Sequence, residues 1–178
     1  KGVSAGMNQW EMLARFARIK EAVNTLPYNQ METVNGAKLG IIASGLAYSY
    51  AVEAIKWLGL EAEVSVLKIG TPHPLPEKLV LELLRSVSEA LVAEELEPFV
   101  ENHVKVLAQE NQLTLKIHGK DVLPIIGELS TRLVTEALAK LTGKTPPSFA
   151  ALDALDTAVA PTLPARPPTL CAGCPHRA

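Results

Sequence analysis

The chain has 178 residues, of which 48% are hydrophobic and 20% charged, a composition typical of a globular protein with a buried core. A net charge of −2, with no clustered lysines or arginines, argues against a nucleic-acid surface. No apolar run reaches the roughly 18 residues of a membrane span, and no leader pattern opens the chain. We therefore expect a cytoplasmic protein without nucleic-acid or membrane partners.

The N-terminal part predicts a helix followed by a short strand. Apolar side chains recur at helical spacing from Trp10 to Leu26, and Pro27 ends this pattern. Residues 28–34 then read as a short exposed strand, closed by the turn signal at Asn35 and Gly36. The chain begins with Lys1 and not methionine, which fits a segment of a longer protein as well as a processed protein.

From Lys38 onward, predicted strands and helices alternate regularly. Gly45 permits a tight turn into the first helix of this series, and Gly143 stands where a helix C-cap is expected. The predicted strands are residues 38–44, 62–69, 90–96 and 113–117, and the predicted helices are residues 46–58, 77–87, 98–110 and 127–143.

This alternation predicts an α/β protein, a three-layer α/β/α sandwich with a mostly parallel sheet. Continuous apolar strands belong in the middle of such a sheet, and strands of alternating polarity belong at its edges. Residues 113–117 alternate strictly, so we place them outermost, with residues 28–34 as a second candidate for an edge.

The composition changes beyond Gly143, where more than half of the 13 prolines lie. Prolines restrict the backbone to extended conformations, and few charged residues accompany them. We therefore expect residues 144–178 to be a linker that runs extended over a surface and delivers the chain to a pair of cysteines near its end.

Cys171 and Cys174 are the only cysteines, and their spacing is typical of metal or cluster ligands. Zinc and iron–sulfur sites need more ligands than two thiolates, although His176 offers a third. Two interpretations stay open: ligation completed by residues outside this chain, or a structural turn with reduced thiols. A redox disulfide is less favoured, because no helix follows whose N-terminus would lower a thiol pKa.

Three histidines were considered as site residues. His73 lies between two prolines at the carboxyl end of a predicted strand, where α/β sheets bind ligands, so it is a candidate contact to a ligand or partner. An exposed histidine without a function is the more common alternative. His103 and His118 are weaker candidates, because no carboxylate or cysteine was recognised at ligand spacing.

Two further motifs favour structural roles. Gly45 opens a helix after a strand, but without a full glycine-rich motif it is better explained by the turn than by a bound phosphate. The carboxylates in "EELEPFVE" (residues 94–101) suit the N-terminus of a helix better than acid/base catalysis. The chain therefore lacks a complete catalytic constellation.

Five segments carry a resemblance to a known family. They are "LGIIASGLAYSYAVEAIKWLG", "LKIGTPHPLPEK", "LVAEELEPFVE", "IHGKDVLPIIGELS" and "PPTLCAGCPHR". In this order and spacing they resemble the alpha subunits of indolepyruvate:ferredoxin oxidoreductases, which belong to the thiamine-diphosphate-dependent 2-oxoacid:ferredoxin oxidoreductases. The resemblance extends from about Trp10 to Arg177.

The resemblance implies that the chain is the middle domain of such a subunit. Residues 28–143 would form a five-stranded sheet domain similar to the C-terminal domain of transketolase, with its first strand antiparallel at one edge. Residues 1–27 would be an N-terminal helix and linker, and residues 144–178 would lead into a thiamine-diphosphate-binding domain. The thiamine-binding and ferredoxin-like domains would lie outside this segment.

The family also implies a reaction for the full-length protein: oxidative decarboxylation of an aryl 2-oxoacid such as indolepyruvate to acyl-CoA. The cofactors would be thiamine diphosphate, Mg²⁺ and 4Fe-4S clusters, with none expected in this segment, and the partners would be a beta subunit, ferredoxin and coenzyme A. Cys171 and Cys174 would be cluster ligands. The segment alone would be inactive. The alternative is a free-standing α/β module that binds a partner or ligand and holds a metal at its cysteine pair.

Overall fold

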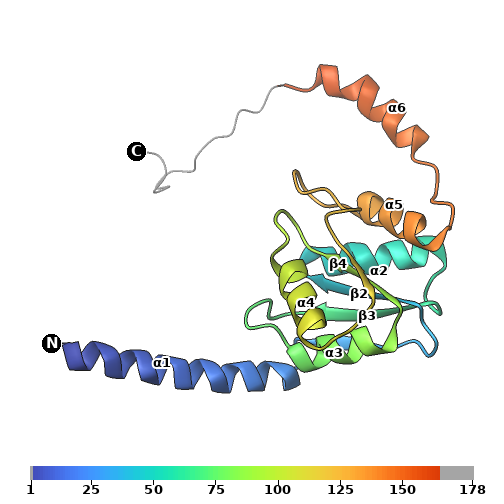
Figure 1. Cartoon of the computed structure of the whole chain (residues 1–178). Coiled ribbons are helices and arrows are strands. Elements are labelled where there is room, and N and C mark those ends of the chain that lie inside the picture. The colour runs from blue at the N-terminus through green and yellow to red at the C-terminus, as the bar shows by residue number, and fades with distance from the viewer. Residues whose placement is uncertain (1, 165–178) are drawn as a thin grey trace. The chain divides into compact units, whose positions relative to one another are not determined.

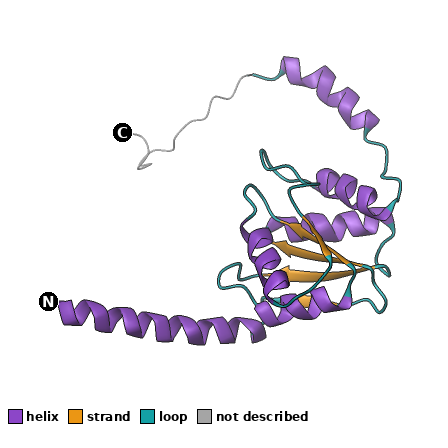
Figure 2. Cartoon of the chain, viewed as in Figure 1, coloured by secondary structure: helices purple, strands orange, loops and turns teal. Residues whose placement is uncertain are grey.

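A five-stranded sheet is the centre of the fold in the computed structural model, which describes residues 2–164 (Figures 1 and 2). The strand order is β1-β3-β2-β4-β5; β1 is antiparallel to β3, and the other neighbours are parallel. The strands are β1 (Gln30–Glu32), β2 (Leu39–Ser44), β3 (Val64–Ile69), β4 (Glu89–Ala93) and β5 (Lys116–His118). The helices are α1 (Gly2–Ala22), η1 (Val23–Thr25), α2 (Leu46–Leu58), α3 (Glu77–Ser86), α4 (Phe99–Glu110), α5 (Thr131–Thr142), α6 (Ala150–Val159) and η2 (Ala160–Thr162).

Helices cover both faces of the sheet, which confirms the predicted three-layer sandwich (Figure 2). α2 and α5 pack on one face, where Ile41, Leu91 and Leu138 are fully buried. α3 and α4 pack on the other, around Ile42 and Leu83. Because successive side chains of a strand point to opposite faces, the adjacent Ile41 and Ile42 contribute to different cores.

The position of each strand follows its apolar pattern. β2 is buried from Leu39 to Ala43 and lies between β3 and β4, as its continuous apolar run predicted. β1 and β5 are the edges, which confirms both predicted edge segments. The antiparallel direction of β1 matches the arrangement that the family resemblance implied.

All five strands are shorter than predicted, and the differences at β4 and β5 have a local cause. β4 ends at Ala93 and not at Leu96, because Glu94 turns away to cap the next helix. β5 begins at Lys116 and not at Leu113, since its partner strand offers it only the three residues from Glu89 onward.

The expectation of an extended C-terminal linker is wrong for residues 150–159, which form α6. This stretch is rich in alanine and leucine, which favour helix, and it contains no proline. The prolines lie on either side of it, at Pro147 and Pro161, where they limit the helix without interrupting it.

Contacts divide the chain into two compact units, Lys1–Pro146 and Pro147–Ala178. The sandwich with α1 belongs to the first unit, and α6 belongs to the second. The domain limits at residues 28 and 143 stay a prediction. Among residues 2–164, no helix combines the length and the apolar character that a membrane span requires.

Asn29 ties the segment before β1 to the loop after β3. Its side chain is 7% exposed, and Oδ1 accepts the backbone N–H groups of Gly70 (2.9 Å) and Thr71 (3.2 Å). Its Nδ2 donates to the carbonyl of Val23 at 2.7 Å and to Thr71 Oγ1 at 2.9 Å. Gly70 also packs tightly, because a Cβ there would lie 2.6 Å from the carbonyl oxygen of Tyr28. The base of the loop that carries His73 is therefore fixed.

We predict that Asn29→Ala lowers the free energy of unfolding by about 1–3 kcal/mol, because it leaves the Gly70 N–H and the Val23 carbonyl without their partner. Urea denaturation measures this. The neighbouring exposed substitution Gln30→Ala is the control and should change the free energy by less than about 0.5 kcal/mol. Equal losses in both variants would contradict the role given to Asn29.

Candidate functional site

The loops after the parallel strands meet at one edge of the sheet, which we call the carboxyl edge. It comprises Gly45 after β2 and residues 70–76 after β3, 94–98 after β4 and 119–130 after β5. Ligands of open α/β sheets bind at this edge, because neighbouring loops diverge there and leave room between them.

Gly45 serves the turn between β2 and α2. Its φ of 57° and ψ of −136° are accessible to glycine and disfavoured for other residues, which confirms the structural interpretation of this position. Within residues 2–164, no group of three or more His, Cys, Asp or Glu side chains converges as metal ligands would.

His73 lies in a cluster of rings from three elements. Its ring centroid is 5.5 Å from that of Phe16 in α1 and 6.1 Å from those of Phe99 and His103 in α4. The ring of His103 is 4.8 Å from that of Phe99, and its Nδ1 lies 2.7 Å from the Phe99 carbonyl oxygen. The structure thus brings together two histidines that the sequence analysis treated separately.

A small cleft of about 280 Å³ opens beside this ring cluster. Apolar and aromatic side chains dominate its walls, and the charged pair Lys20 and Glu77, joined at 2.6 Å, lies at its rim. Its volume lies at the lower end of the roughly 300–1,000 Å³ typical of ligand pockets. The residues that line the cleft include Phe16, His73, His103 and Val106.

Glu94 caps the N-terminus of α4. Its side chain is 6% exposed, Oε2 accepts the N–H of Val100 and Oε1 accepts the N–H of Glu101, both at 2.8 Å. The first N–H groups of a helix have no partner within the helix, and a negative charge there is stabilised by the helix dipole. This geometry confirms the interpretation that the carboxylate complements the helix.

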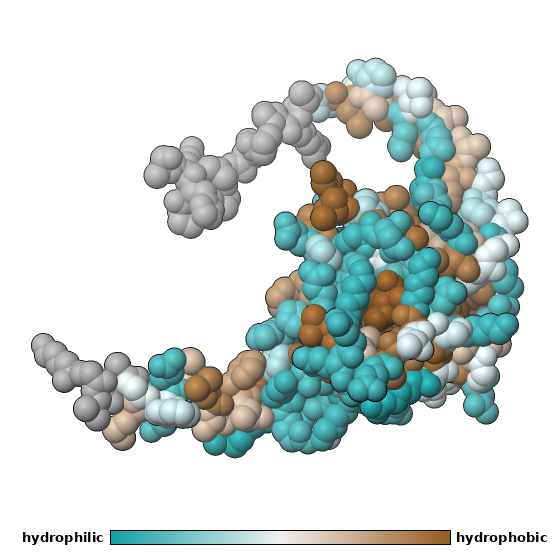
Figure 3. All heavy atoms as spheres, in the orientation of Figure 1, coloured by the Kyte–Doolittle hydropathy of each residue, from teal (hydrophilic) through white to brown (hydrophobic). Residues whose placement is uncertain are grey.

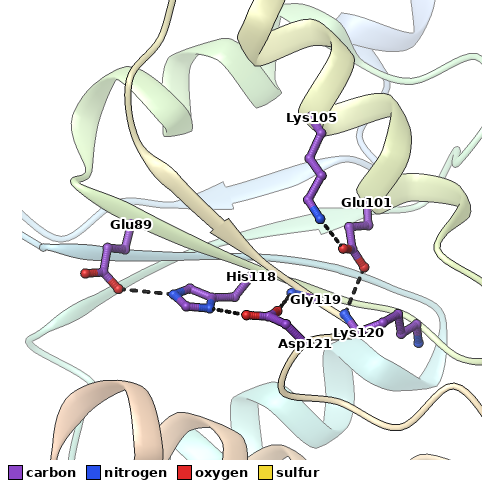
Figure 4. A network of polar contacts seen from close by, with 7 residues as sticks. All are labelled: Glu89, Glu101, Lys105, His118, Gly119, Lys120 and Asp121. Atoms are coloured by element: carbon purple, nitrogen blue, oxygen red, sulfur yellow. Dashed lines mark hydrogen bonds and ion pairs between the residues drawn. The ribbon is translucent and has the colours of Figure 1, made fainter.

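Glu101 fastens the loop after β5 to α4 (Figure 4). Its side chain is 4% exposed, and its oxygens accept hydrogen bonds from Lys105 Nζ at 2.5 Å and from the backbone N–H of Lys120 at 2.9 Å. A Cβ on Gly119 would lie closer than 3.0 Å to this carboxylate. Only glycine therefore lets the loop approach the buried glutamate.

Lys120 closes the same network from the loop side. Its Nζ donates to the backbone carbonyl of Glu94 at 2.5 Å. Burial lowers the pKa of Lys120, and the negative charges of Glu94, Glu101 and Glu95 offset only part of that effect. The lysine thus joins the loop after β5 to the loop after β4 and has a structural role in this arrangement.

His118 has two carboxylate partners, so the prediction that none stands at ligand spacing is wrong. The ring is buried, its Nδ1 lies 2.8 Å from Asp121 Oδ2, and its Nε2 lies 3.4 Å from Glu89 Oε2 (Figure 4). Asp121 follows only three residues later, in a turn where its Oδ1 accepts the Gly119 N–H at 2.7 Å, so this local pattern was available. Glu89 comes from the neighbouring strand β4, which local spacing does not reveal.

The remaining predicted site residues, Cys171 and Cys174, lie outside the described residues together with His176. Their role as cluster ligands stays a prediction. His73 is placed at the carboxyl edge, and its contact to a ligand or partner also stays a prediction.

We predict that Gly119→Ala lowers the free energy of unfolding by about 1–3 kcal/mol, because the added methyl group displaces the Glu101 carboxylate from its hydrogen bonds. Thermal unfolding followed by circular dichroism measures the change. Gly6→Ala is the control, since its Cβ would meet nothing within 4 Å and alanine favours a helix. A Gly119→Ala variant as stable as the wild type would rule out the tight contact.

A second prediction concerns acid stability. Burial alone would raise the pKa of Asp121, but the hydrogen bond from the Gly119 N–H and the contact with His118 lower it below its ordinary value. A carboxyl group with a lowered pKa stabilises the fold above its unfolded-state pKa, and this contribution is lost as the pH falls through the lowered value.

Urea denaturation from about pH 6 to pH 2 should therefore show wild-type stability falling below about pH 4, with a smaller fall in Asp121→Asn. Asp156→Asn removes the same charge from an exposed position outside the network and should keep the wild-type profile. Parallel curves for wild type and Asp121→Asn would show that this carboxylate does not contribute.

No protein-family model matches the chain, but individual proteins do. It is 44% identical over 167 residues to the indolepyruvate oxidoreductase subunit IorA of Thermococcus kodakarensis, and also 44% identical over 167 residues to that of Pyrococcus horikoshii. The IorA subunit of Archaeoglobus fulgidus is 34% identical over 170 residues. The matches cover 93–94% of this chain but 26% of each relative, so the chain spans about a quarter of their length.

Two solved structures share the fold. A split-gene transketolase, described as an inactive beta4 tetramer, superposes with a TM-score of 0.51 at 23% identity over 65% of this chain and 42% of that one. The 2-oxoglutarate:ferredoxin oxidoreductase of Magnetococcus marinus gives 0.57 at 15% identity over 75% of this chain and 23% of that one. They confirm the transketolase-like architecture. In sequence, the chain is therefore similar to one segment of indolepyruvate oxidoreductase IorA subunits.

Proposed function

We propose that the chain is the transketolase C-terminal-like domain of a longer subunit that oxidatively decarboxylates aryl 2-oxoacids, with indolepyruvate as the substrate. The observation that carries this proposal is the 44% identity to IorA subunits over 93% of the chain. Residues 28–143 would be the domain itself. Residues 1–27 would lead into it, and residues 144–178 would lead on to a thiamine-diphosphate-binding domain.

In the longer protein, the 2-oxoacid would lose carbon dioxide, its acyl carbon would be oxidised, and the acyl group would pass to the thiol of coenzyme A. The electrons would leave through 4Fe-4S clusters to ferredoxin. Thiamine diphosphate with Mg²⁺ supplies carbanion stabilisation when bound. We assign no step of the reaction to residues 2–164.

The contribution of this segment would be placement of the other parts. The buried Glu94 and Glu101 hold the loops of the carboxyl edge in a fixed geometry, which is what a domain between cofactor-bearing domains requires. Beyond the described residues, Cys171 and Cys174 would ligate a cluster in the longer subunit. We further propose a cytoplasmic location, and a beta subunit, ferredoxin and coenzyme A as partners of the whole enzyme.

The test compares the 178-residue chain with the longer subunit, each assayed with its beta subunit for reduction of ferredoxin that depends on indolepyruvate and coenzyme A. We expect activity only in the longer subunit, and weaker activity with pyruvate, which lacks the aryl group. The isolated chain should bind neither thiamine diphosphate, by calorimetry, nor an iron–sulfur cluster, by absorption spectroscopy.

A different outcome would favour the free-standing module. If the isolated chain bound stoichiometric zinc and its melting temperature rose, the proposal would be overturned, because a metal that binds only the folded state stabilises it. The variant Cys171→Ser/Cys174→Ser is the control. If the chain is a free-standing zinc module, the variant should not show the rise in melting temperature with zinc. Under our proposal, the variant should unfold like the wild type.

A further inference from the structure

Three large apolar side chains stand exposed on the loops after β4 and β5. Leu96 is 58% exposed, Ile125 49% and Ile126 85%, and we call this group the apolar tip. Hydrophobic atoms project from the body of the protein at the loop between β5 and α5 (Figures 1 and 3). Exposure of apolar side chains of this size to water is unfavourable, and covering them with another surface lowers the free energy.

The two loops that carry the apolar tip are held together. Lys120 Nζ donates to the carbonyls of Glu94 at 2.5 Å and Pro124 at 3.5 Å, so one ammonium group bridges both loops. The Leu129 N–H donates to Glu95 Oε1 at 3.3 Å. The two loops that carry the apolar tip are therefore fastened to each other.

Buried anchors lie on both sides of the exposed isoleucines. Leu123 is 2% exposed and Leu129 is 3% exposed, so the loop is fastened to the core before and after Ile125 and Ile126. Backbone hydrogen bonds from Val122 and Leu123 to the Gly119 carbonyl add a turn at its base. Because the loop is fastened at both ends, its apolar residues cannot easily fold back onto this chain and are presented outward.

The backbone at Leu96 supports the same interpretation. Its φ of 55° lies in the left-handed region, which a leucine adopts at a cost that glycine would not incur. The side chain gains little burial within the described residues in return. A contact with a surface outside this chain would bury the Leu96 side chain and offset the cost of its backbone conformation.

Acidic side chains surround the apolar tip. Glu95 and Glu97 flank Leu96, and Glu128 follows the isoleucines; all three are exposed. A surface that fits here is apolar at its centre and carries lysine or arginine at its rim, because like charges across an interface repel.

The size of the apolar tip indicates whether the surface that covers it belongs to a separate protein or to the same polypeptide. Stable interfaces between separate proteins take about 20–30 residues from each side, and this group is far smaller. A small patch suffices when both surfaces belong to one polypeptide, since the tether raises their effective concentration. About three quarters of each IorA relative lies outside the segment that this chain matches, so a tethered occupant is available.

We propose that the apolar tip, Leu96, Ile125 and Ile126, is a docking surface for an apolar, basic-rimmed face of the remainder of the longer subunit. This inference rests on the proposed function only in assuming that such a subunit contains this segment. It names the surface by which the domain is positioned.

Hydrogen–deuterium exchange of residues 119–130 tests the proposal in the isolated chain and in the longer subunit. We expect exchange at least about tenfold slower in the longer subunit, since docking covers the loop. Ile126→Glu in the longer subunit should restore fast exchange. Thr114→Glu is the control: it adds the same charge at an exposed position before β5, at the other end of that strand, and should leave the protection intact.

In the isolated chain, Ile126→Glu should leave the melting temperature unchanged, which separates docking from a folding defect. Equal exchange rates in the wild-type isolated chain and the wild-type longer subunit would overturn the proposal without any substitution. A concentration-dependent dimer of the isolated chain that Ile126→Glu abolishes would also overturn it, in favour of a second copy as the occupant.

Ferredoxin reduction measured on the same preparation of the longer subunit separates the two proposals. Protection of residues 119–130 without indolepyruvate oxidation would refute the proposed reaction and leave the docking surface standing. Oxidation without protection would refute the docking surface alone.

Discussion

Burial of β2 and β4 on both faces is the constraint on which the rest of the structure depends. Two strands with continuous apolar side chains need a helical layer on each side, and parallel neighbours need a helix between them. The crossovers then bring every loop after a parallel strand to the same edge. The carboxyl edge, with its histidines, glutamates and exposed apolar residues, is thus a consequence of how the core is buried.

At the carboxyl edge, charged side chains hold the loops in place. Within residues 2–164, every buried side-chain nitrogen or oxygen has a hydrogen-bond partner, so the network around Glu94 and Glu101 is satisfied. A buried carboxylate without partners would be costly, whereas one that caps a helix and receives a lysine is tolerated. The network therefore holds the loops after β4 and β5 against the start of α4.

Local sequence signals predicted some contacts of the candidate site and missed others. The helix cap at Glu94 followed from carboxylates beside an expected helix start, because capping joins residues that are close in sequence. The ring cluster of His73 with Phe16 and His103 joins α1, the loop after β3 and α4, which have no common local pattern. The pairing of His118 with Glu89 depends on the order of strands in the sheet, although its partner Asp121 lay within local reach.

By itself, the sequence determined the alternation of strands and helices, the three-layer architecture, the buried central strand and both edges. Hydrophobic periodicity and the positions of glycine and proline act over a few residues, so their effects can be predicted from the sequence alone. Residues 150–159 form a helix that their alanine and leucine content already favoured. Only the tertiary structure decided where β4 ends, where β5 begins, and which side chains meet at the carboxyl edge. Those outcomes depend on how many partner residues a strand finds and on contacts between distant segments, whose energies no local pattern contains.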